Sequence, residues 1–133
     1  MPWTKNLAVG VELIDSEHIK LFEMADQLFE AGRNHKAAEF IGELFGFLDD
    51  YTKKHFADEE KYMQQINYPD YPLQKKLHDE FIVKLGEMRK EFNESGGNIS
   101  LIISANQMIL DWLVKHISVL DKKIGEYVRE KNL

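Results

Sequence analysis

The chain has 133 residues, of which 44% are hydrophobic and 30% charged, the proportions of an ordinary water-soluble protein with one core. Its formal net charge of −6, with no basic cluster, argues against nucleic acid and anionic membrane surfaces as partners. The lack of cysteine excludes disulfides, iron–sulfur clusters, thiolate zinc sites and a cysteine nucleophile.

The first 14 residues have no helical periodicity and predict an extended N-terminal arm anchored by Trp3. They lack the charged-then-apolar layout of a signal peptide, and no apolar run in the chain approaches the length of a membrane span. We therefore expect a soluble, cytoplasmic protein. Its oligomeric state, a monomer or an unknown oligomer, is left open.

Apolar residues then recur at helical spacing in segments separated by short turns. Asp15 or Ser16 is the predicted N-cap of the first segment. Residues 67–72 form a turn because each proline disfavours helix in the residue before it, and residues 95–98 end the third helix and cap the fourth. The predicted helices cover about 15–32, 36–66, 72–93 and 98–117, followed by a short C-terminal helix at about 118–129.

Long amphipathic helices joined by short connections pack beside their chain neighbours in antiparallel fashion. No alternating strand pattern and no internal repeat appears in the sequence. The prediction is an all-α fold, an antiparallel up-down-up-down four-helix bundle with an N-terminal extended arm. It forms a single domain over residues 1–133, with the arm at 1–14.

The second predicted helix carries two polar residues inside its apolar stripe. His55 and Glu59 are four residues apart, so their side chains point only about 40° apart. Burying these groups without partners costs several kcal/mol, so something must compensate them. Each of the other long helices also has one histidine in its stripe: His18, His78 and His116.

These four histidines are predicted to share one layer of the bundle. With turns centred near residues 34, 69 and 96, each histidine lies about 16 to 21 residues from the end that holds the first and third turns. At about 1.5 Å of rise per residue, the spread along the bundle is roughly 7 Å. Four inward-facing imidazoles would therefore surround one buried point.

Two carboxylates can join that layer. Glu59 is one turn from His55, but Asp121 follows His116 by five residues and is about 140° away on a straight helix. Asp121 joins only if the helix ends, bulges or bends near residues 117–119. Buried histidines are often purely structural, but this set of imidazoles and carboxylates suits iron, manganese or zinc. The number of ligands predicts two metal ions.

These motifs resemble the bacterial hemerythrin family over nearly the whole chain. The matching pieces are Trp3, DSEH at 15–18, HFADEE at 55–60, YPDY at 68–71, HDEF at 78–81 and WLVKHI at 112–117, followed by Asp121. The resemblance implies a non-haem di-iron centre that binds O2 reversibly. It implies that Glu59 and Asp121 bridge the irons with an oxo or hydroxo group. His18 and His55 would hold the iron that binds O2, and His78 and His116 the other.

The resemblance also suggests an apolar O2 pocket, which the chemistry itself requires because water and protons must be kept from the reduced irons. Plain core packing is the alternative interpretation of these side chains. The six residues are Leu21, Phe56, Phe81, Trp112, Ile117 and Val119.

The third helix departs from the family pattern. The family has His-x-x-x-His there, whereas this chain has Gln74 at the first position and His78 at the second. An amide oxygen is a weaker and harder ligand than an imidazole. The second iron would bind Gln74 weakly, take a water or lie partly vacant, and an open position would favour redox turnover.

The leading interpretation is a metal-dependent protein, not an enzyme, that binds O2 for carriage, storage or sensing. One alternative is a di-iron redox enzyme acting on O2, peroxide or nitric oxide, and the expected partner is thus O2 or another small diatomic or peroxide ligand. The second alternative is a metal-free helical interaction module. Ferritin-like di-iron enzymes would need Glu-x-x-His pairs, and this sequence has none.

Overall fold

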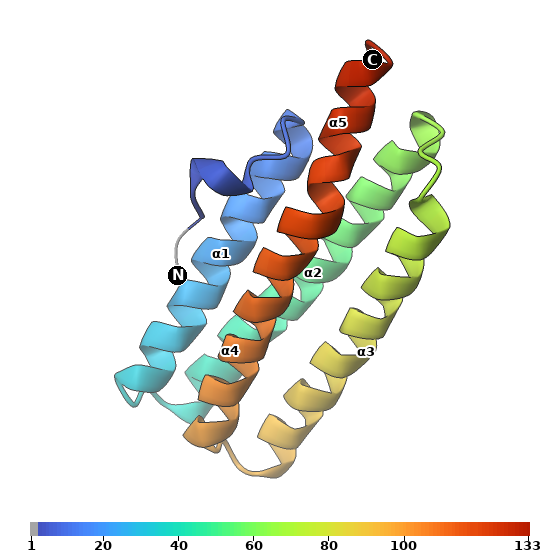
Figure 1. The fold of residues 1–133 in the computed structure, drawn as a ribbon. Coiled ribbons are helices and arrows are strands. Elements are labelled where there is room, and N and C mark those ends of the chain that lie inside the picture. The colour runs from blue at the N-terminus through green and yellow to red at the C-terminus, as the bar shows by residue number, and fades with distance from the viewer. Residues whose placement is uncertain (1–2) are drawn as a thin grey trace.

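The computed structural model describes residues 3–133. Over that range it has four long helices, α1 (Glu12–Arg33), α2 (Ala38–Gln65), α3 (Tyr71–Glu94) and α4 (Ile99–His116), and a shorter α5 (Lys122–Glu130). The α1–α2 and α3–α4 turns lie at one end of the bundle and the α2–α3 turn at the other (Figure 1). The predicted up-down-up-down four-helix bundle is confirmed.

The N-terminal segment is less extended than predicted. A 3₁₀ turn covers Lys5–Leu7, and α1 begins at Glu12 instead of at about residue 15. Asp15 therefore lies inside the helix and is not its N-cap. Its carboxylate accepts hydrogen bonds from the backbone N–H groups of Val9 and Gly10, at 2.7 and 3.1 Å, which ties the arm to the first turn of α1.

The other helix ends follow local chemistry. Asn98 caps α4 as predicted, because its Oδ1 accepts the backbone N–H of Ser100 at 2.9 Å. Such a cap contributes about 1 kcal/mol. Pro72 lies in the first turn of α3, where its missing N–H has no helical partner to lose. The remaining bounds differ from the predicted ones by a few residues, as fraying helix ends commonly do.

A π-helix over Ile117–Asp121 joins α4 to α5. Hydrogen bonds in a π-helix link residues five apart, so His116 and Asp121 come onto the same face. The predicted irregularity near residues 117–119 is confirmed. The C-terminal helix, however, begins at Lys122 and not at about 118, because the π-turn occupies the residues between.

The core consists of apolar side chains from all four long helices, among them Phe22, Phe45, Leu85 and Ile109. Burial of each such side chain contributes about 1.5–3 kcal/mol. Trp3 packs against the edge of this core, as the sequence predicts. Within residues 3–133, no helix is both long enough and apolar enough to cross a membrane.

Candidate metal centre

All seven polar residues predicted for the site lie in the core, and none is more than 6% exposed. Each of the four long helices contributes at least one of them, and the π-turn contributes the last. They are His18 on α1, His55 and Glu59 on α2, Gln74 and His78 on α3, His116 at the end of α4, and Asp121.

The candidate donor atoms form two groups that share one carboxylate, and within each group the atoms lie within 4.8 Å of one another. Imidazole rings also pair up in the same way, with centroids 4.7 Å apart in the first group and 5.1 Å in the second. The first group is His18, His55 and Glu59, and the second is Glu59, His78, His116 and Asp121.

The shared carboxylate, Glu59, directs its two oxygens to different histidine pairs. Its Oε2 lies 3.3 Å from His55 Nε2 and 3.6 Å from His18 Nε2. Its Oε1 lies 3.2 Å from His78 Nε2. One side chain therefore faces both groups at once.

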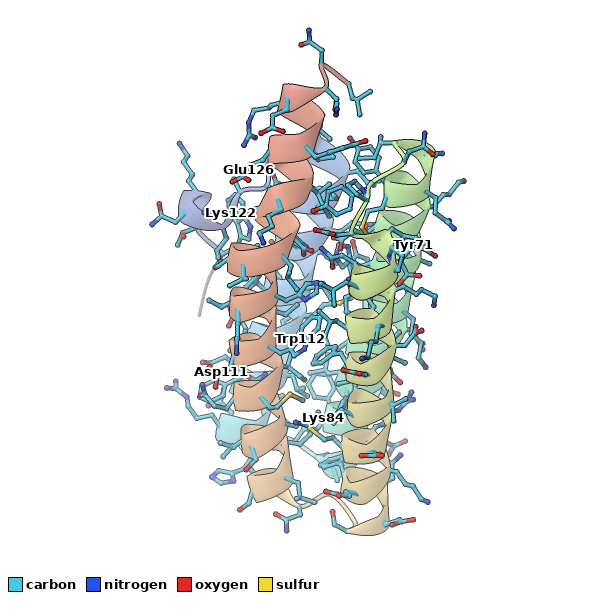
Figure 2. The ribbon with its side chains drawn as sticks, turned by 45° about the vertical axis from the view of Figure 1, so that its right-hand side comes forward. Tyr71, Lys84, Asp111, Trp112, Lys122 and Glu126 are labelled. Atoms are coloured by element: carbon cyan, nitrogen blue, oxygen red, sulfur yellow. The ribbon has the colours of Figure 1, made fainter. Side chains whose placement is uncertain are left out.

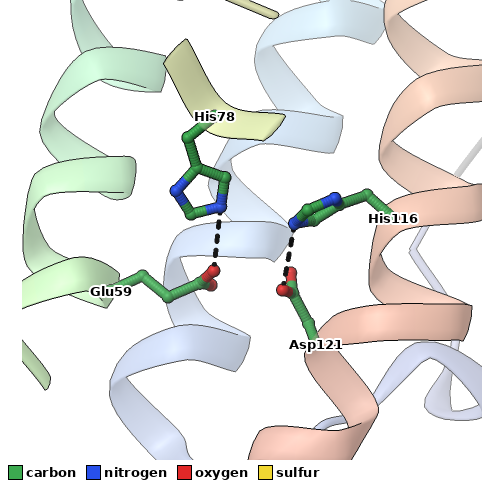
Figure 3. A group of neighbouring side chains, drawn as sticks. All are labelled: Glu59, His78, His116 and Asp121. Carbon is green, nitrogen blue, oxygen red and sulfur yellow. Dashed lines mark ion pairs between the residues drawn. The ribbon is translucent and has the colours of Figure 1, made fainter. Parts of the chain in front are cut away.

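Asp121 is arranged in the same way from the opposite side. Its Oδ2 lies 3.2 Å from His18 Nε2, and its Oδ1 lies 3.3 Å from His116 Nε2. Figure 3 shows Asp121 facing His116 while Glu59 faces His78. The π-turn is the local feature that makes this possible, since it rotates Asp121 toward the histidine layer.

Several of these atoms have no hydrogen-bond partner within residues 3–133. Both carboxylate oxygens of Glu59 and Nε2 of His78 are fully buried. The two residues lie within ion-pair distance of each other, but these atoms do not meet the geometry of a hydrogen bond. Buried polar atoms are seldom left in this state, and a cation between them would satisfy them. The donors are imidazoles and carboxylates without sulfur, the set that suits iron, manganese or zinc. The residues therefore fit a metal centre.

Opposite charges lie close together in this buried group of histidines and carboxylates. Burial lowers the pKa of His18, but the contacts with Asp121 and Glu59 outweigh it and raise that pKa to about 9. Burial raises the pKa of Glu59, but the contacts with His18 and His55 hold it well below its usual value. The pKa of Asp121 is lowered as well, because its contacts with His116 and His18 outweigh burial and the charge of Glu59.

Gln74 lies inside the cluster. Its amide oxygen accepts a hydrogen bond from His116 Nε2 at 2.7 Å, and its amide nitrogen donates to Asp121 Oδ1 at 3.0 Å. The amide oxygen thus occupies the direction in which His116 points its Nε2. A metal held by His116 would have this amide beside it.

Two carboxylates that the sequence analysis did not assign also belong to the site. Glu17 Oε1 lies 2.9 Å from His55 Nδ1, and Glu60 Oε2 lies 2.9 Å from His78 Nδ1. Histidines that bind metals usually donate their other ring N–H to such an acceptor. Both glutamates adjoin a predicted ligand in the sequence, but helical neighbours point about 100° apart, so adjacency alone did not identify them.

Aromatic rings cover the second histidine pair. Phe56 stacks on the ring of His78 with centroids 3.9 Å apart, and Trp112 stacks on that of His116 at 4.3 Å. Figure 2 shows Trp112 between α3 and α4. The other predicted pocket residues that are buried here are Leu21, Phe81 and Ile117.

Val119 is the exception among the predicted pocket residues, since it is 52% exposed. It lies in the π-turn that carries Asp121 inward, and neighbouring positions of one turn cannot all face the core. Val119 lines a surface cleft of about 260 Å³ with Leu77, Trp112, Lys115, His116 and Leu120. It is therefore not part of an enclosed pocket.

The family model described as Hemerythrin HHE cation binding domain matches residues 9–128. The chain belongs to the hemerythrin family. It is 32% identical over 127 residues to a bacteriohemerythrin of Stenotrophomonas maltophilia, a match that covers 96% of this chain and 80% of that protein. It is also 32% identical over 121 residues to the myohemerythrin of Sipunculus nudus, covering 91% of this chain and 88% of that one.

A crystal structure of wild-type hemerythrin matches this hemerythrin fold with a TM-score of 0.87 at 28% identity, covering 95% of each chain. Membership of the hemerythrin family implies a non-haem di-iron centre and O2 binding. Both groups of candidate ligands, and Gln74 beside His116 and Asp121, lie inside the range that the hemerythrin model matches.

Proposed function

We propose that this hemerythrin binds O2 reversibly at two iron ions, for carriage, storage or sensing. One observation carries the proposal: Glu59 and Asp121 each direct one oxygen to one histidine pair and the other oxygen to the second pair. In the proposed centre both carboxylates would hold both irons, and an oxo or hydroxo group would complete the bridge. When bound, the irons supply the electrons and the coordination position that O2 requires.

The two histidine pairs take different roles in this proposal. His18 and His55 hold the iron that accepts O2, and His78 and His116 hold the other iron. This division is supported by Gln74, which lies against His116 and gives the second side an additional oxygen donor. The side with fewer protein donors keeps the open coordination position that a ligand needs.

Apolar side chains keep the proposed centre dry. Exclusion of water and protons protects reduced irons from irreversible oxidation, so a closed lining belongs to reversible binding. Trp112 covers one face of the His116 ring by stacking on it. The rest of the proposed lining, each residue no more than 2% exposed, is Leu21, Phe56, Phe81 and Ile117.

Gln74 favours a second candidate function, a di-iron redox enzyme acting on O2, peroxide or nitric oxide. Its amide is a weaker ligand than the imidazole of the family pattern, so a small substrate can compete for that position. Its amide N–H group, which donates to Asp121 in the structure, also offers a hydrogen bond to such a substrate. Both properties favour turnover over reversible binding.

One experiment separates these functions: iron content per chain, with visible spectra of the protein in air, after reduction and after reoxygenation. A band that returns reversibly with O2 supports reversible binding. Irreversible bleaching with formation or consumption of peroxide supports the redox enzyme. A chain that takes up no metal on reconstitution contradicts both and leaves the metal-free helical interaction module. A cytoplasmic location, the lack of a nucleic-acid partner and the oligomeric state stay predictions.

A further inference from the structure

Two side-chain networks of the same design lead from the candidate metal centre to the surface. In the first, Glu17 accepts from His55 Nδ1 through one oxygen and from Lys54 Nζ through the other, at 2.9 and 3.1 Å. Lys54 also contacts Asp58, one turn later on α2, at 2.7 Å. The network therefore links α1 to α2 and joins a buried imidazole to a surface lysine.

The second network repeats this order on the next pair of helices. Glu60 Oε2 lies 2.9 Å from His78 Nδ1, and Glu60 Oε1 lies 3.5 Å from Lys75 Nζ. Lys75 contacts Asp79, again one turn later, at 2.8 Å. Each of the two histidine pairs thus has one member held by a glutamate that is backed by a lysine.

Not every histidine of the candidate centre has such a network. His18 Nδ1 is buried and has no hydrogen-bond partner among the described residues, although it belongs to the same pair as His55. The glutamates differ in depth as well, with side chains 6% exposed for Glu17 and 14% for Glu60. The lysines are partly in solvent, with side chains 60% and 45% exposed for Lys54 and Lys75.

We propose that Glu17 with Lys54, and Glu60 with Lys75, are positioning residues that set the metal affinity of the two halves of the centre separately. The inference rests on the proposed function, since it needs metals at these histidines. A carboxylate oxygen only accepts hydrogen bonds, so each glutamate fixes the proton on Nδ1 and directs the Nε2 lone pair to the metal. It also makes the imidazole a stronger donor.

The lysines have the opposite effect to the glutamates on the donor strength of the imidazoles. A nearby ammonium group draws electron density from the glutamate and weakens it as an acceptor. Loss of the lysine therefore strengthens the imidazole as a ligand, whereas loss of the glutamate charge weakens it. A merely structural network would not show these opposite signs, because removal of either member would loosen the site.

The test is titration of the metal-free protein with Co2+, followed by its visible absorption, together with NMR detection of the histidine Nδ1–H groups. Glu17→Gln and Glu60→Gln should each weaken one binding step about 10- to 100-fold and leave the other near wild type. Lys54→Met and Lys75→Met should each tighten the corresponding step. The Nδ1–H signals of His55 and His78 should be slow to exchange in the metal-free wild type.

The neighbouring lysines on the same helices are matched controls. Lys53→Met and Lys76→Met remove the same charge but lie outside both networks, so Co2+ affinity should not change. The lysine variants keep the test decisive if a buried Glu→Gln variant does not fold. Weakened binding in Lys54→Met and Lys75→Met, or a response equal to that of the controls, overturns the inference. A wild type that binds no Co2+ but shows protected Nδ1–H groups contradicts the proposed function and confines the glutamates to orienting the rings.

Discussion

The two halves of the candidate centre hold their histidines in different ways. His18 and His55 meet edge to face, and in the described part of the chain only His55 has a carboxylate hydrogen-bonded to its Nδ1. His78 and His116 are each covered by a stacked aromatic ring, and His116 also bonds to the amide of Gln74. The histidines of the first half therefore have fewer polar and aromatic contacts, and those of the second half are the more constrained.

In the second half, an amide (Gln74) takes the position where the family pattern has an imidazole. Gln74 is buried and bonds to His116, so this position still faces the histidine layer. We expect only the strength of this one donor to differ from the family pattern. Loss of a group that the two halves share should therefore have a larger effect than a change in a group that distinguishes them.

Loss of the shared carboxylate should have the largest effect. Glu59→Gln keeps the volume of the side chain but removes the charge that faces both histidine pairs, so iron content should fall from two per chain to below one. Elemental analysis measures this, with circular dichroism to verify the helical fold. Glu43→Gln, exposed on the same helix, is the control and should keep both irons. Two irons retained in Glu59→Gln would contradict a shared ligand.

Because of His18 in the first half, we expect the stability of the metal-free protein to depend on pH. Burial lowers the pKa of His18, but the contacts with Asp121 and Glu59 outweigh it and raise that pKa from 6.5 to about 9. A group whose pKa is raised by folding stabilises the folded state fully at pH values below its pKa in the unfolded chain. This stabilisation is lost as the pH rises through its pKa in the folded protein. Unfolding free energy should therefore fall between about pH 6.5 and pH 9, by on the order of 3 kcal/mol at most.

Denaturant titrations at several pH values measure this loss. The metal-loaded protein is the control, because a metal on Nε2 replaces the proton and removes the dependence in that range. A metal-free protein that becomes more stable between pH 6.5 and pH 9 would show that His18 is not charged in the folded state.

Restoration of an imidazole on the second half should have a smaller effect. Gln74→His should tighten iron binding by His78 and His116 about tenfold, a gain of about 1.4 kcal/mol, and should slow autoxidation. Metal competition and the rate of loss of the oxygenated spectrum measure these. Gln107→His, at an exposed position of α4, is the control. An unchanged autoxidation rate and iron content would show that position 74 does not affect the chemistry.

The smallest effect is expected at Val119. Because this side chain is half exposed, Val119→Ala should change stability by less than about 0.5 kcal/mol and leave autoxidation unchanged. Ile117→Val, two residues earlier but fully buried, should cost about 0.5–1.5 kcal/mol. Thermal unfolding and autoxidation rates compare the two. Faster autoxidation in Val119→Ala would return this residue to the O2 pocket.

The sequence predicted the elements that depend on periodicity. Counting residues from the turns brought His18, His55, His78 and His116 to one level, and the five-residue step to Asp121 required the π-turn that the structure contains. Both results follow from helix geometry, which fixes rise and angle per residue.

The parts that the sequence did not predict depend on rotation and reach of side chains. Glu17 and Glu60 reach histidines on a neighbouring helix, which depends on how two helices are turned toward each other. Val119 faces solvent because of the same wide turn that brings Asp121 inward. The first helix begins early because Asp15 accepts hydrogen bonds from the arm, a tertiary contact without a periodic signal.

In the proposed centre, Glu59 and Asp121 join two metals. Mössbauer spectroscopy of the oxidised protein loaded with iron-57, with iron counted per chain, tests it most directly. We expect two irons per chain whose spins couple antiferromagnetically to a diamagnetic ground state. One iron per chain, or two magnetically independent ferric ions, would contradict it.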